Sequence, residues 1–254
     1  MEYELTFWTV IMLLVSGLAA GFVNTLAGGG GLFTLSALML MGIPADIANG
    51  TNRVSVAAQS IEGVRGFHRH NVLDKSAIRP ILLPTLSGSL IGSVVASWMP
   101  VWLLKPMLLG TMIAMAVVLL LRPSVMAPSA DELPKKLADS PGGWLALFAA
   151  GLYGGFVQGG VGFLLLFALV GVLRYNLLAG NALKLVCTGV FGAVALTVFA
   201  IRGQVLWIPG LIITAGTLVG VRMSVGFAVK ANADTLRIVL LLAVIGACVA
   251  AFFR

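Results

Sequence analysis

Charged residues are scarce in this chain. Lysine, arginine, aspartate and glutamate together make up 10% of its 254 residues, whereas soluble domains carry about 25%. Hydrophobic residues make up 59%, and the mean hydropathy is +1.06. This composition excludes an ordinary soluble domain and predicts a multi-pass protein of the lipid bilayer. Because the apolar segments are continuous rather than alternating, helices are favoured over a transmembrane β-barrel.

Side chains that could carry catalysis or hold a cofactor are also few. The two histidines, His68 and His70, share one loop, and the two cysteines, Cys187 and Cys248, lie inside apolar segments. They form no metal-ligand cluster and give no support for a disulfide. No intramembrane pair of carboxylates and no phosphate-binding glycine motif followed by Lys and Ser or Thr is present. We therefore predict no enzyme activity, no catalytic residue, no metal and no cofactor.

The formal net charge is +7, which raises the question of nucleic-acid binding. The basic residues are spread over short loops, and no Lys/Arg cluster is dense enough for a nucleic-acid surface. Basic loops of this kind set the orientation of membrane helices. We predict no nucleic-acid partner.

The stretch Gly21–Arg53 reads GFVNTLAGGGGLFTLSALMLMGIPADIANGTNR and is the most unusual part of the chain. Four consecutive glycines, Gly28–Gly31, interrupt apolar sequence, and each costs about 1 kcal/mol of helix propensity relative to alanine. A helix broken at membrane depth is tolerated only where protein or a watery cavity covers the freed backbone groups. The stretch therefore predicts a site built partly from backbone. Helix N-termini at Gly31 and Gly162 would favour an anion there.

This stretch recurs in the second half of the chain. Lys184 lies 22 residues after Gly162, as Arg53 lies 22 residues after Gly31. Four landmarks fall in the same order in both halves, at offsets between 128 and 134, and indicate an internal duplication. The other three are Gly21-Phe22-Val23 with Gly155-Phe156-Val157, Gly88-Ser89-Leu90-Ile91-Gly92 with Gly216-Thr217-Leu218-Val219-Gly220, and Leu104-Lys105 with Leu236-Arg237.

Each half contains a glycine-broken hairpin followed by three longer apolar segments. A hairpin returns to its starting side, so each half crosses the membrane three times and the two halves must be inverted. We predict an all-α integral membrane protein of two inverted repeats, residues 1–122 and 144–254, joined by a cytoplasmic linker, 123–143. The predicted apolar segments are about 7–26, 31–41, 50–66, 77–97 and 101–121, then 144–173, 178–200, 207–228 and 236–253.

Charge predicts the orientation. The loop from Arg65 to Arg79 carries four Lys/Arg residues against one acidic residue, Asp74, and should be cytoplasmic. The loop around Arg202, with a single basic residue, the loop with Asp46 and both chain termini should then be periplasmic.

Arg53 and Lys184 are the leading candidates for substrate contacts. A cation at mid-bilayer costs roughly 2.5–3.5 kcal/mol on insertion scales. We interpret the pair as facing one central anion site from opposite halves. The alternative is that both side chains lie near helix ends and snorkel to the membrane surface.

Neutral polar residues accompany both glycine breaks. Asn24 and Gln158 occupy matched positions inside the apolar arms, where a capping role explains less. Asn49, Thr51, Asn52 and Asn181 could contact a ligand or cap helix ends.

Two further features have structural explanations. Glu62 stands three residues before Arg65 on a predicted helix, which favours an ion pair; the alternative is a proton-coupling carboxylate. The paired glycines of the GSLIG and GTLVG segments are predicted to be helix-contact faces.

The stretch Gly21–Arg53 resembles the signature of the TauE/SafE family of membrane permeases, often called sulfite exporters. GLYGGFVQGGVGFLLLFALVGVLRYNLLAGNALK resembles the family's second motif. The resemblance covers nearly the whole chain and implies export or exchange of sulfite or organosulfonates across a prokaryotic inner membrane. A common form of the motif has Lys where this chain has Arg53, which keeps the charge but changes the geometry of anion contact.

The sequence thus predicts a transporter that moves a small sulfur-containing anion by alternating access between inverted repeats. The alternatives are an anion channel and a non-transporting membrane scaffold or assembly factor. The residues predicted to contact the substrate are Asn24, Gly29, Gly30, Gly31, Thr51, Asn52, Arg53, Gln158, Gly162, Asn181 and Lys184.

Overall fold

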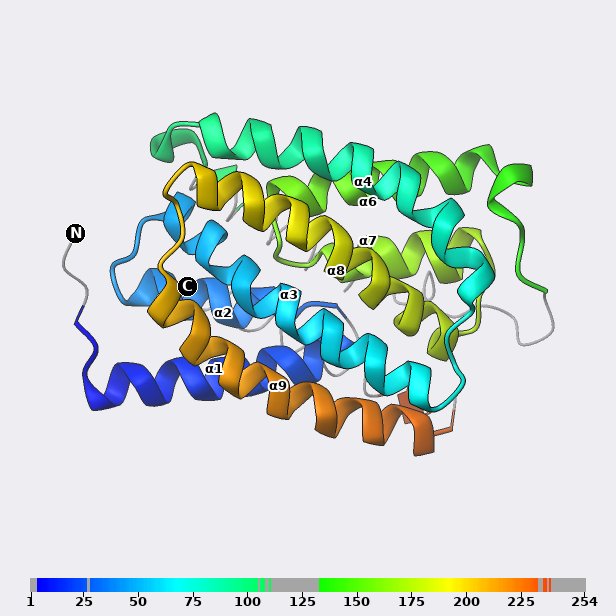
Figure 1. Ribbon diagram of the computed structural model, residues 1–254, viewed down its shortest axis with the longest axis horizontal. Coiled ribbons are helices and arrows are strands. Elements are labelled where there is room, and N and C mark those ends of the chain that lie inside the picture. Colours follow the sequence, from blue (N-terminus) through cyan, green and yellow to red (C-terminus); the bar gives the residue numbers. More distant parts are fainter. Residues whose placement is uncertain are drawn as a thin grey trace.

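The structure is a computed structural model that describes residues 4–26, 28–104, 106–107, 110, 133–232, 235–236 and 238. Within these residues every regular element is helical, and the long helices lie side by side in a bundle (Figure 1). Four of them, α1, α4, α8 and α9, are long and apolar enough to cross a membrane. The predicted segments at about 101–121 and 236–253, and the linker up to residue 132, lie almost entirely outside the described residues.

The first half begins with the predicted hairpin. Helix α1 spans Phe7–Leu26 and α2 spans Gly31–Leu40. Figure 1 shows α2 running back beside α1, so the short second arm returns to the side where α1 starts. Helices α3 (Ala45–Arg69) and α4 (Lys75–Trp98) follow. Helix α3 starts about five residues earlier than predicted, because Pro44 ends the preceding turn with extended ψ and its carbonyl accepts from Ala48 N.

The second half repeats this order of elements. A short 3₁₀ helix, η2 (Leu137–Asp139), precedes α6 (Pro141–Phe156) and α7 (Val161–Leu166). The chain continues from α7 into a π-helical segment, η3 (Phe167–Val172), then α8 (Leu177–Ile201) and α9 (Trp207–Lys230). Helix α6 starts three residues before the predicted segment at 144, because the Ser140 hydroxyl caps it by accepting from Gly143 N.

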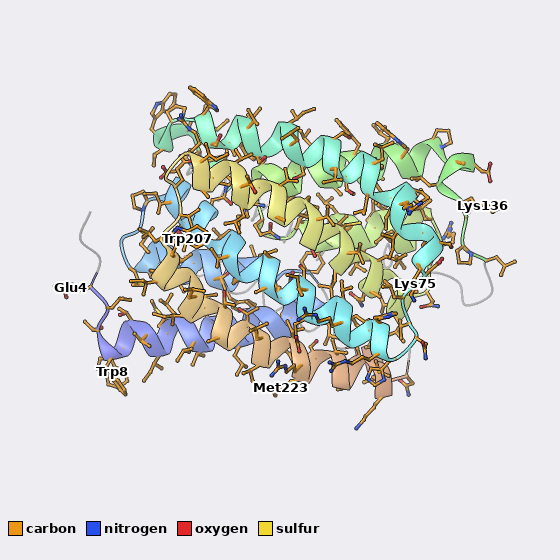
Figure 2. All side chains as sticks on the ribbon, in the orientation of Figure 1. Glu4, Trp8, Lys75, Lys136, Trp207 and Met223 are labelled. Atoms are coloured by element: carbon orange, nitrogen blue, oxygen red, sulfur yellow. The ribbon has the colours of Figure 1, made fainter. Side chains whose placement is uncertain are left out.

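Corresponding helices run in opposite directions. In Figure 1, α1 and α3 run away from the end that carries the N-terminus, and α6 and α8 run toward it. Figure 2 places Lys75 and Lys136 at one end of the bundle, here called the basic end. Trp8 and Trp207 lie at the other, here called the tryptophan end. The α3–α4 loop and the segment before α6 therefore share an end, and the α8–α9 loop lies at the opposite one.

Close glycine contacts join each broken arm to the last long helix of the other half. A Cβ on Gly216 or Gly220 of α9 would lie 2.1 Å from the carbonyl oxygen of Leu14 or Leu18 of α1. A Cβ on Gly88 or Gly92 of α4 would lie 2.3 or 2.0 Å from a carbonyl oxygen of α6. The predicted helix-contact faces are thus confirmed. Their partners are further glycines at the same spacing, Gly17 and Gly21 on α1 and Gly151 and Gly155 on α6.

Helices α3 and α8 pack against one another in the middle of the bundle. Both carry buried polar side chains, and a 3.0 Å hydrogen bond between the Ser60 and Thr188 hydroxyls links them. These two helices supply the cations of the candidate site.

Candidate functional site

The two glycine breaks meet backbone to backbone. A Cβ on Gly162 would lie 2.2 Å from the Cα of Gly28, and a Cβ on Gly28 would lie 2.3 Å from the Cα of Gly162. Gly28 has φ +95 and Gly160 has φ +81, conformations that favour glycine. Helix α2 starts at Gly31 as predicted, whereas α7 starts at Val161, one residue before the predicted position. The crossing point leaves no room for a side chain on either strand of backbone.

Arg53 reaches from α3 to the C-terminal end of α6 in the other half. Its Nη1 donates to the carbonyl oxygen of Gly154 and to Gln158 Oε1, and its Nη2 donates to the Gly155 carbonyl (2.9 Å) and Asn49 Oδ1 (3.2 Å). Asn49 also donates to the Phe156 carbonyl. The guanidinium lies 5.5 Å from the centre of the Phe199 ring. Arg53 therefore holds the last turn of the broken helix α6.

Lys184 reaches from α8 to the C-terminal end of α1. Its Nζ donates to the carbonyl oxygens of Asn24 (2.7 Å) and Thr25 (3.0 Å) and to Asn181 Oδ1 (2.7 Å). A lysine ammonium has three N–H donors, and all three have acceptors. Lys184 thus does for α1 what Arg53 does for α6.

Each cation is placed where a helix C-terminus carries partial negative charge. Both side chains are fully buried, so neither extends to the membrane surface as a snorkelling side chain would. All their acceptors are neutral carbonyl or amide oxygens. The described residues hold one salt bridge, and it involves neither Arg53 nor Lys184. Two cations are therefore balanced here by dipoles rather than by carboxylates.

Three buried N–H donors of this region have no acceptor: Asn24 Nδ2, Asn52 Nδ2 and Arg53 Nε. A buried polar group without a partner costs about 1–3 kcal/mol. We call these three groups the unpartnered donors. All three belong to residues that the sequence predicts to contact the substrate.

The unpartnered donors surround the first turn of α2. The side chain of Asn24 adjoins Gly30, where an added Cβ would lie 2.6 Å from Asn24 Cβ. Asn52 Oδ1 accepts a 2.6 Å hydrogen bond from Thr34 of α2. The backbone of Gly31 adjoins Gln158, the partner of Arg53. An N-terminal helix turn and three N–H donors thus come together on one side of the crossing point.

The other predicted residues lie close by with different partners. Thr51 Oγ1 accepts from Leu206 N and so holds the start of α9. Gly29 adjoins the Phe163 ring, and Asn181 accepts from Lys184. Nothing in these contacts tests whether Thr51 or Asn181 meets a substrate.

Sequence reasoning missed three polar groups around the breaks. Thr34 orients Asn52, and the Tyr153 hydroxyl donates to the Gly159 carbonyl in the second break. Gln59, two turns beyond Asn52 on α3, is buried and its Oε1 has no partner. A polar residue in an apolar context was the available signal for Thr34 and Gln59.

The partner predicted for Glu62 is wrong. Glu62 Oε1 accepts a 2.7 Å hydrogen bond from Arg222 of α9 rather than pairing with Arg65. Arg222 was interpreted as an end-of-helix cation. Packing of α3 on α9 brings the two side chains together from opposite halves of the chain.

These long apolar helices, with cations buried between broken helices, define a multi-pass helical membrane protein. The model of the sulfite exporter TauE/SafE family matches residues 13–251, and the chain belongs to that family.

Similar proteins from three bacteria carry related names. The chain is 27% identical over 212 residues to a "Probable membrane transporter protein" of Haemophilus influenzae, covering 84% of this chain and 82% of that protein. It is 26% identical over 212 residues to the "Probable membrane transporter protein YfcA" of Escherichia coli K12, with 84% and 78% covered. It is 24% identical over 236 residues to the "Probable membrane transporter protein ORF9" of Sinorhizobium sp, with 92% and 88% covered. No solved structure matches the chain significantly.

Proposed function

We propose that this protein transports a small sulfur-containing anion, such as sulfite or an organosulfonate, across a prokaryotic inner membrane. The observation that carries the proposal is the set of unpartnered donors, Asn24 Nδ2, Asn52 Nδ2 and Arg53 Nε, around the first turn of α2. An oxyanion supplies the acceptors that these donors lack. It also brings negative charge to two cations that have no carboxylate partner.

The chemistry of the site suits a compact oxyanion. Sulfite and sulfonate groups each present three oxygen acceptors, and charge-assisted hydrogen bonds to such groups are stronger than neutral ones. The N-terminus of α2 adds its dipole, which favours an anion. Arg53 and Asn52 would provide side-chain donors from α3 and Asn24 from the end of α1. The glycines at positions 29, 30 and 31 would let the anion approach backbone N–H groups.

Alternating access between inverted repeats is the mechanism we infer. Its support is that α1 and α3 run opposite to α6 and α8, and that the glycine contacts between α1 and α9 recur between α6 and α4 (Figure 1). Secondary transporters with inverted repeats bind substrate between broken helices near the midplane. Here Arg53 and Lys184 each bridge the two halves, so rocking of one half against the other would change the contacts of both cations.

Labelling of single cysteines tests the inverted arrangement. In a variant with Cys187 and Cys248 replaced by alanine, we introduce Lys75→Cys or Arg202→Cys, each at an exposed loop or helix-start position. An impermeant thiol reagent should label Arg202→Cys in intact cells and Lys75→Cys only after the cells are opened. Labelling of both from the same side would contradict the inverted repeat.

Counterflow tests the function itself. Proteoliposomes loaded with unlabelled sulfite should accumulate external labelled sulfite transiently above equilibrium, and organosulfonates should compete. An anion channel would carry the label down its gradient without this overshoot. A scaffold would give uptake equal to that of empty liposomes. Either outcome would overturn the proposal.

A further inference from the structure

At the tryptophan end of the bundle, two buried oxygen atoms have no hydrogen-bond donor. They are Asp46 Oδ1 in the first turn of α3 and Gln204 Oε1 in the α8–α9 loop. The two side chains touch, since Gln204 Nε2 donates to Asp46 Oδ2 at 3.3 Å. The same Nε2 donates to the Ser97 carbonyl at the end of α4 at 3.4 Å. A carboxylate, an amide oxygen and a main-chain carbonyl thus meet from three separate elements.

The cluster is rich in acceptors and has no cation. No Lys or Arg of the described chain forms a salt bridge with Asp46. The neighbouring Arg202 is stacked on Trp98, with its guanidinium 4.1 Å from the ring centre. The N-terminal dipole of α3 stabilises the charge of Asp46, but it supplies no donor to Oδ1. The two unpartnered oxygens therefore call for a positively charged ligand.

We propose that Asp46, Gln204 and the Ser97 carbonyl bind a sodium ion. Oxygen ligands suit hard cations, and all three groups present oxygen. A single carboxylate favours a monovalent ion, because protein sites for calcium gather several carboxylates. The Ser97 carbonyl lies at the C-terminal end of α4, and such helix ends coordinate sodium in secondary transporters. Water completes the shell, since Asp46 and Gln204 are only partly buried.

The proposed sodium site is mechanically linked to the candidate anion site. Asp46, Gly50 and Arg53 follow one another at spacings of four and three residues, along one face of α3. A Cβ on Gly50 would lie 2.1 Å from the Gln204 carbonyl oxygen, and Thr51 accepts from Leu206 N of the same loop. An ion held by Asp46 and Gln204 therefore fixes the α8–α9 loop on the part of α3 that carries Arg53.

The site belongs to one end of the bundle alone. The position that matches Asp46 at the offset of Arg53 to Lys184, 131 residues, is Leu177. If the proposed anion transport holds, this asymmetry makes sodium a coupling ion that enters from the tryptophan end.

Thermal unfolding of the purified full-length protein in detergent tests sodium binding without any transported anion. In choline chloride, added NaCl should raise the unfolding temperature saturably, and KCl should not. Asp46→Asn should weaken the apparent sodium affinity by at least about tenfold. Gln204→Ala, which leaves the carboxylate in place, should weaken it as well.

Asp74→Asn is the matched control. Asp74 caps α4 from the basic end by accepting from Ser76 N, and asparagine is an equally good cap, so its sodium response should equal that of the wild type. Equal unfolding temperatures in sodium, potassium and choline would overturn the proposal. So would an unchanged response in Asp46→Asn, or stabilisation by acid that replaces the effect of sodium. Because no anion is present, these outcomes are independent of the transport assay.

Discussion

Gly162→Ala is expected to abolish transport and to lower the unfolding temperature markedly, while the protein still inserts into the membrane. The added Cβ would lie 2.2 Å from Gly28 Cα and 2.9 Å from the Gly28 carbonyl oxygen. These neighbours are backbone, so no side chain can move aside. Overpacking a core typically costs 1–3 kcal/mol, and we expect about 3 kcal/mol here because both breaks must separate.

Gly226→Ala is the matched control. Gly226 lies inside α9, and a Cβ there meets no atom within 4 Å. This variant should be as active as the wild type and up to about 1 kcal/mol more stable, since alanine favours helix. Thermal unfolding and counterflow on both variants measure the difference. If Gly162→Ala behaved like Gly226→Ala, the tight crossing of the breaks would be wrong.

Arg53→Gln and Lys184→Gln are expected to separate the two roles of the buried cations. Arg53 has an unpartnered Nε in addition to four hydrogen bonds, so its loss should weaken anion binding by about 1–3 kcal/mol, roughly 5- to 150-fold. Arg53→Lys keeps the charge and should be milder. All three N–H donors of Lys184 are used by α1 and Asn181, so its loss should act mainly on stability.

The stability cost has two opposing parts. Losing Lys184 leaves the Asn24 and Thr25 carbonyls without this donor, at about 1–3 kcal/mol for each buried acceptor left unpaired. Removing a charge from the membrane interior returns roughly 2.5–3.5 kcal/mol on insertion scales. We expect a net loss of about 1 kcal/mol, visible as a lower unfolding temperature. An unchanged unfolding temperature in Lys184→Gln would contradict the helix-end role.

Much of the architecture could be predicted because its signals are local. Four glycines in apolar sequence interrupt a helix through their own propensity, and α1 ends and α2 begins around them as expected. The GSLIG and GTLVG pairs identify helix contacts because glycine at four-residue spacing leaves a flat helix face. Boundaries such as the start of α3 were less accurate, since polar residues after Pro44 hide an early helix start.

The contacts of the site could not be predicted, because they join residues far apart in the chain. Arg53 and Gly154 are 101 residues apart, and Lys184 and Asn24 are 160 apart. The sequence identified the cations without showing that each holds the broken helix of the other half. The local three-residue rule pointed Glu62 to Arg65, whereas packing of α3 on α9 brings it to Arg222. The buried Thr34 and Gln59 became visible as part of the region only once α2 and α3 were in place.

Sulfite affinity of the purified protein, measured by equilibrium dialysis, tests the central claim most directly. The comparison is wild type, Arg53→Gln and Arg222→Gln, the last removing an exposed arginine whose partner is Glu62 rather than the glycine breaks. We predict that Arg53→Gln weakens sulfite binding at least about fivefold and that Arg222→Gln leaves it unchanged. Wild-type affinity in Arg53→Gln would contradict an anion site at the unpartnered donors.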